Sequence, residues 1–114
     1  MLAKLYRFHG YGSLRGVYKR GQVVRGQLIN LKFETRGNQK SYRAAVVVSK
    51  KVHKSAVIRN QIRRRVYEIV RQQTEANLNG FDLVFTAFSE EVATLDQAQL
   101  EAIVKNLLHK ATKG

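Results

Sequence analysis

SKKVHKSAVIRNQIRRRVYEIVR, residues 49–71, is a loop that leads into one strongly basic predicted helix. Ser55 is a suitable N-cap for this helix, and residues 77–80 offer a suitable end. At about 100° per residue, the helix has two neighbouring sectors. The apolar sector holds Ile58, Ile62, Val66, Ile69 and Val70. The other sector, called the basic stripe below, holds Arg59, Asn60, Arg63, Arg64, Tyr67 and Arg71.

Arg65 lies outside the basic stripe, on the side of the predicted helix that carries Glu68. Its expected partner is therefore Glu68, three residues further on, in a weak pair on the helix surface.

The basic stripe has two interpretations. Most charged helix faces are simply solvated, and such faces usually mix acidic and basic side chains. This stripe contains no acid and places Asn60 and Tyr67 among its arginines. Arginine offers paired hydrogen bonds to phosphate, while Asn and Tyr add hydrogen bonding and stacking. The pattern therefore favours a surface that binds a polyanion.

The composition points to the same class of partner. The chain has 114 residues, with 21 Lys and Arg against 8 Asp and Glu, and a formal net charge of +13. Residues 1–74 contain 18 basic and 2 acidic side chains, whereas residues 75–114 contain 3 and 6. A nucleic acid would relieve the repulsion within so basic a chain, and the first two thirds should provide the binding surface.

The chain contains no cysteine, which excludes disulfides and thiolate metal sites. Its first residues lack the pattern of a secretion signal, and no stretch approaches the roughly 20 apolar residues that span a bilayer. We therefore expect a cytoplasmic protein that neither crosses nor anchors in a membrane.

The segments before the basic helix predict a helix and two strands. An irregular arm of residues 1–12, which we expect to be flexible, precedes a short helix of residues 13–19, with Ser13 as N-cap and Gly21 as stop. Residues 27–34 alternate apolar and polar side chains, as a half-buried strand does, and residues 42–49 form a second, more apolar strand. The polar turn at residues 36–40 predicts that these strands pair antiparallel.

The segments after the basic helix predict one strand and one helix. Residues 81–88, FDLVFTAF, form a continuous apolar run that is typical of a central strand covered on both faces. Thr94 and Gln97 then suit a capping box. Apolar residues recur at helical spacing after it: Leu100, Ile103, Val104, Leu107, Leu108 and Ala111. The order predicts one α/β (α+β) domain, a two-layer sandwich with a small mixed sheet of about four strands and three helices.

The residues needed for protein-based phosphodiester hydrolysis are not grouped in the sequence. Such an enzyme needs clustered carboxylates for metal ions or a pair of histidines as acid and base. Glu34, Glu68 and Asp82 are predicted on three different elements. The three histidines show no metal-ligand spacing. We therefore expect no catalytic residue and no metal site in this chain.

Residues 49–71 closely resemble the signature of the bacterial ribonuclease P protein component, in which an S-K-K loop precedes R-N-x-[IV]-[KR]-R on a helix. The shared residues are Ser49, Lys50, Lys51, Arg59, Asn60, Ile62, Arg63, Arg64 and Glu68. GVYKRG, residues 16–21, is similar to the V-F-x-x-G segment of that family, and GFDLVFTA, residues 80–87, is similar to its D-[IV]-V segment. The chain departs from the family at Leu14 and Lys32, where an aromatic residue is common, and at Tyr67, where a basic one is common.

The resemblance implies a fold like domain 2 of ribosomal protein S5, with the basic helix in a left-handed βαβ crossover, although right-handed connections dominate in proteins generally. It also implies the protein subunit of an endoribonuclease. A catalytic RNA, using Mg²⁺, would remove the 5′ leader of precursor tRNA, and the protein would be monomeric outside that complex.

The resemblance and the basic stripe together predict the residues that bind RNA. They are Lys50, Lys51, Lys54, Arg59, Asn60, Arg63, Arg64, Tyr67 and Arg71. The resemblance places the leader in a cleft beside the first helix, where Leu14, Tyr18 and Lys32 would line it. Tyr18 offers a ring to a leader base, whereas Leu14 is more simply explained as a core residue.

Two other functions fit the same charge. One is a module that binds structured RNA, for example on the ribosome, with no part in catalysis. The other is a DNA-binding basic helix, which normally needs a dimerisation element to set its spacing on the duplex. The last predicted helix is too short for a sustained zipper, which makes the second alternative the weaker one.

Overall fold

This computed structural model describes residues 11–35, 42–73 and 78–113, with side chains described from residue 16 to residue 112. The helices are α1 (Tyr11–Arg20), α2 (Ala56–Arg71), the 3-10 helix η2 (Glu90–Ala93) and α3 (Gln97–Lys113). The strands are β1 (Gln22–Val24), β2 (Ile29–Thr35), β3 (Arg43–Val48) and β4 (Phe81–Ala87). The expected arm at residues 1–12 lies almost entirely outside the described residues, as does the expected turn at residues 36–40.

The strands form one sheet in the order β1-β2-β4-β3. β4 pairs antiparallel with β2 and parallel with β3, so it separates the two strands that the sequence predicts to be partners. That predicted hairpin is wrong. The apolar run of β4 is buried on both faces, with Leu83, Val84 and Phe85 all at 0% exposure, and such a strand belongs in the middle of a sheet.

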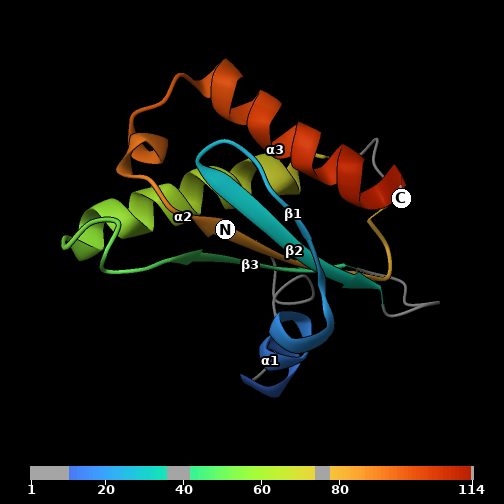
Figure 1. Ribbon diagram of the computed structural model, residues 1–114. Coiled ribbons are helices and arrows are strands. Elements are labelled where there is room, and N and C mark those ends of the chain that lie inside the picture. The colour runs from blue at the N-terminus through green and yellow to red at the C-terminus, as the bar shows by residue number, and fades with distance from the viewer. Residues whose placement is uncertain (1–10, 36–41, 74–77, 114) are drawn as a thin grey trace.

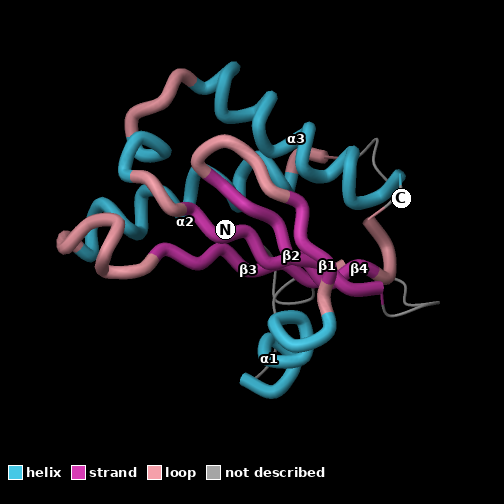
Figure 2. Tube along the Cα trace, viewed as in Figure 1, coloured by secondary structure: helices cyan, strands magenta, loops and turns pink. Residues whose placement is uncertain are grey.

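Helices cover both faces of the sheet (Figures 1 and 2). α2 and α3 lie on one face, where Leu31 and Leu83 join the main core, and α1 lies on the other. Side chains alternate along a strand, so Lys32 and Glu34 of β2 face α1 and bond to it. The sequence predicts two layers, and α1 adds helical cover on the second face.

The main core is built from the apolar faces of α2 and α3. α2 buries Ile62, Val66, Ile69 and Val70, the apolar sector expected from the sequence apart from half-buried Ile58. α3 buries Leu100, Val104, Leu107, Leu108 and Ala111. Burial of each large side chain stabilises the fold by about 1.5–3 kcal/mol. This packing fixes which side of α2 faces the solvent.

Three helix boundaries differ from the expected ones. α1 begins at Tyr11, two residues before Ser13, and α2 ends at Arg71 with Gln72 as its C-cap. α3 begins at Gln97, and Thr94 instead ends η2 with a bond from its N–H to the Glu91 carbonyl. Two expectations are confirmed. The Ser55 Oγ accepts from the Ile58 N–H at the start of α2, and the Gly21 N–H bonds the Val17 carbonyl at the end of α1.

Two ion pairs lie on the α1 side of the sheet. Arg43 donates to both carboxylate oxygens of Asp82, at 2.9 and 2.7 Å, and the Asp82 side chain is only 3% exposed. The hydrogen bond to Asp82 is the main cause of the raised pKa of Arg43. The second pair joins Arg20 to Glu34, 2.9 Å apart, and its arginine side chain is 64% exposed.

We predict that Asp82→Asn destabilises the protein by about 1–3 kcal/mol, because the variant loses a charged acceptor beside the partly buried Arg43 guanidinium. Glu34→Gln is the matched control, and it should cost clearly less than Asp82→Asn because water screens its exposed partner Arg20. Urea unfolding measures both. Equal losses in the two variants would contradict the structural role given to Asp82.

Candidate nucleic-acid interface

The solvent side of α2 presents most of the basic stripe. Asn60, Arg64 and Arg71 are exposed, and Arg59 and Arg63 are partly exposed. The packing of Ile62 and Val66 in the core holds these side chains outward. The stripe therefore forms one continuous surface on a rigid element.

Arg59 organises the loop before α2. Its Nη1 donates to the carbonyls of His53 and Lys54, at 3.0 and 2.9 Å. The His53 Nδ1 accepts from the Ser55 N–H at 3.0 Å, which tightens the same loop. Lys50, Lys51 and Lys54 are exposed on this loop. These lysines come shortly before the stripe in the sequence. In the structure, Arg59 helps to hold the loop that carries them.

Asn60 and Arg63 form a pair on the stripe, in which the Arg63 Nη1 donates to the Asn60 side-chain oxygen. Arg64 has no hydrogen bond or ion pair to the described residues. The guanidinium groups of Arg63 and Arg64 thus keep donors available for an anion on the solvent side.

Tyr67 lies at the edge of the stripe and bonds within the protein. Its hydroxyl accepts from the Val46 N–H of β3 at 3.1 Å, and its ring packs against the main core. β3 is an outer strand of the sheet. Asn60 and Arg63 share the side of the helix that carries Tyr67, so this part of the stripe lies on the side of α2 that reaches the open edge of β3 through Tyr67.

Arg71 pairs with Glu68 on the surface of α2. The hydrogen bond from Arg71 is the main cause of the lowered pKa of Glu68. This pair corrects the expectation that Glu68 would bond Arg65. It also leaves Arg71 partly neutralised, so that the positive charge of the stripe is concentrated at its N-terminal half.

Arg65 has a structural position that the sequence does not reveal. Its guanidinium donates to the carbonyls of Val92 and Leu95, at 2.7 and 2.5 Å, and to the side chain of Gln97 at 3.3 Å. These three acceptors lie in η2, in the connection that follows it and at the start of α3. Arg65 therefore ties α2 to that connection, and long-range bonds of this kind leave no local sequence signal.

Two of the three expected cleft residues lie together on the α1 side of the sheet. The Lys32 Nζ donates to the Tyr18 carbonyl at 2.5 Å and lies 5.6 Å from the centre of the Tyr18 ring. The ring is accessible, because Tyr18 is 42% exposed. Leu14 belongs to α1, but its side chain lies outside the described ones.

The carboxylates of the described residues do not offer a metal site. No group of three or more His, Cys, Asp and Glu residues lies close enough there to hold an ion. Asp82, Glu34 and Glu68 each bond an arginine instead. No described helix has the length and apolar character needed to cross a membrane.

A basic helix on the parallel crossover of a small mixed sheet also occurs in known proteins. The family model for ribonuclease P matches residues 2–112. This chain belongs to the ribonuclease P protein family. It is 36% identical over 109 residues to the ribonuclease P protein component of Clostridium kluyveri, covering 94% of this chain and 95% of that protein. It is 35% identical to the one from a Pseudanabaena species, covering 97% and 95%.

Solved structures agree with this assignment. The ribonuclease P protein of Thermotoga maritima superposes with a TM-score of 0.79 at 27% identity, covering 91% of this chain and 96% of that one. A Staphylococcus aureus ribonuclease P protein mutant with defective mRNA degradation activity shares the fold, with a TM-score of 0.81 at 23% identity and coverage of 95% and 89%. Membership of the family supports a role in tRNA 5′ processing as part of a ribonucleoprotein, in partnership with the ribonuclease P RNA.

We predict that Arg65→Ala destabilises the protein by about 1–3 kcal/mol, because it removes three hydrogen bonds that fix the connection between η2 and α3. Arg64→Ala, the neighbouring substitution with the same loss of charge, should stay within about 0.5 kcal/mol. Thermal and urea unfolding provide the comparison. A stable Arg65→Ala protein would mean that those bonds contribute little.

Proposed function

We propose that this chain binds the catalytic RNA of ribonuclease P through the basic stripe of α2 and the lysines of the loop before it. The observation that carries the proposal is the set of outward-facing cations on a helix whose other side is locked in the core. Such a surface needs no rearrangement to meet phosphates, and so it binds without a large ordering cost.

We also propose that the 5′ leader of precursor tRNA lies on the α1 side of the sheet, in the cleft expected from the family. Tyr18 would stack on a leader base, and Lys32 beside it would favour the approach of the phosphates. Because Tyr67 bonds the open edge of β3 and shares a side of α2 with Asn60 and Arg63, RNA held on that side lies near the edge. The leader then has a short path around β3 to Tyr18.

In this proposal the RNA performs the Mg²⁺-dependent hydrolysis. Asp82, Glu34 and Glu68 already bond arginines, and the other described acids form no group of three or more ligands that could hold the ion. The protein contributes binding and orientation, which lower the barrier by positioning the substrate. The proposal includes a cytoplasmic location and a monomeric protein outside the ribonucleoprotein.

Arg63→Ala together with Arg64→Ala should weaken binding to a bacterial ribonuclease P RNA. The logarithmic salt dependence of the affinity should fall by roughly one unit per lost phosphate contact at most. Filter binding over a range of salt concentrations measures both quantities. Lys105→Ala, which removes an exposed charge from α3, is the control. An unchanged affinity and salt dependence in the double variant would refute the role of the stripe.

Tyr18→Ala should weaken the binding of a precursor tRNA with a leader of several nucleotides to the assembled ribonucleoprotein by about fivefold or more, the effect of losing one stacked base. A substrate with a single leader nucleotide is the internal control and should bind the variant and the unaltered protein equally. Tyr18→Phe should retain most of the affinity because it keeps the ring. A loss that is the same for both leader lengths would contradict leader contact at Tyr18.

A further inference from the structure

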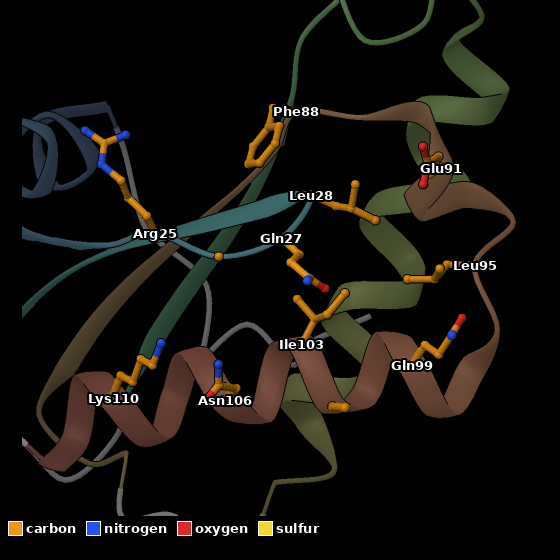
Figure 3. Close-up of a pocket in the computed structure, with 12 residues that line it drawn as sticks. Arg25, Gln27, Leu28, Phe88, Glu91, Leu95, Gln99, Ile103, Asn106 and Lys110 are labelled. Carbon is orange, nitrogen blue, oxygen red and sulfur yellow. The ribbon is translucent and has the colours of Figure 1, made fainter.

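A second surface is built from residues other than those of the basic stripe and Tyr18. It is a groove of about 1090 Å³ between α3, the β1–β2 connection and the connection from β4 to η2 (Figure 3). In that view Leu28, Leu95 and Ile103 point into its middle from three different elements. Phe88, at the end of β4, forms part of its wall and is 50% exposed.

The polar residues of the groove are unevenly placed. Arg25 and Lys110 lie toward one end, on opposite sides, and the acidic Glu91 lies at the other end (Figure 3). The side chains of Gln27, Gln99 and Asn106 border the groove, and they have no hydrogen bonds to the described residues. Amides offer both donors and acceptors, so they suit the edges of nucleobases, while the two cations suit phosphate.

The backbone at Leu28 adds a further sign that this surface has a use. Leu28 is the one non-glycine residue of the described chain with a positive φ, at 65°. The Phe88 N–H donates to the Leu28 carbonyl at 3.0 Å, and this bond holds Leu28 and Phe88 next to each other in the groove. A branched side chain is rarely kept in this conformation, and such residues concentrate at binding sites.

The groove continues a surface that begins on α2. A smaller groove of about 420 Å³ is lined by Gln61, Arg64, Arg65 and Glu68 of α2, and by Ala93 and Gln97. Glu68 bonds Arg71, which offsets its charge there. Leu95, between Ala93 and Gln97, lines the larger groove. The two grooves thus share the connection from η2 to α3 as a wall. A strand of RNA that leaves Arg64 can cross this connection and enter the larger groove.

We propose that the larger groove holds an unpaired segment of the RNA bound on α2, with a base on the Phe88 ring, one phosphate beside Lys110 and another beside Arg25. This inference rests on the proposed function, because the RNA must first be held by the basic stripe. A protein partner is the main alternative occupant. The net charge of +13, the two cations against the single acid Glu91 in the lining, and the amides that border the groove favour nucleic acid.

The first test is NMR titration of the ¹⁵N-labelled full chain with a single-stranded oligouridylate of about 12 nucleotides. We expect shifts in the amides of α2 and also in those of Gly26, Leu28 and Phe88. Shifts confined to α2 would overturn the groove inference and leave the proposed function intact. Shifts in the groove without any on α2 would contradict the proposed function, and with it the RNA path described here.

The second test uses variants with the same oligonucleotide. Phe88→Ala should weaken binding about fivefold or more, whereas Phe88→Tyr should retain the affinity. Arg25→Ala with Lys110→Ala should lower the salt dependence by about 1.4 at most, about 0.7 for each contact to single-stranded RNA. Lys105→Ala, on α3 but outside the groove, is the matched control. If Phe88→Ala and the double variant of Arg25 and Lys110 both bind like the unaltered chain, the inference is refuted.

Discussion

The parallel pairing of β3 with β4 is the constraint on which the rest of the structure depends. Parallel neighbours cannot be joined by a tight turn, so the chain must cross over the sheet between them. α2 makes that crossing, and its apolar face is held against the sheet by Ile62, Val66, Ile69 and Val70. The opposite face of α2 must therefore point outward into the solvent. A run of arginines on this helix becomes a rigid cationic surface because a neighbouring run of aliphatic side chains fills the core.

The same helix orientation gives neighbouring arginines different tasks. Arg63 and Arg64 face the solvent with donors available, whereas Arg65 bonds the carbonyls of Val92 and Leu95. Arg59 stands between these cases, because it fixes the preceding loop and is only partly exposed. Charge alone therefore does not define the interface. A shift of one residue along the helix, from Arg64 to Arg65, turns a guanidinium that faces the solvent into one that joins two parts of the fold.

Local patterns predict the elements of this chain better than their pairing. The apolar run of β4, the periodicity of α3 and the Ser55 cap all give signals within a few residues, and each is confirmed. The hairpin of β2 and β3 is wrong because a turn signal does not reveal that a later strand will lie between its arms. The bonds of Arg65 and Tyr67 likewise join residues that are 27 and 21 positions apart. The three-residue strand β1 is too short to show the alternation of apolar and polar side chains, and it was not predicted from the sequence.

We infer that this chain assists a catalytic RNA and does not cleave RNA itself. The most direct measurement is cleavage of a 5′-extended precursor tRNA by a bacterial ribonuclease P RNA at low Mg²⁺, with the protein, without it, and with the protein alone. We expect protein-dependent cleavage at the mature 5′ end and no cleavage by the protein alone. Cleavage by the protein alone, or no stimulation despite demonstrated binding to that RNA, would contradict it.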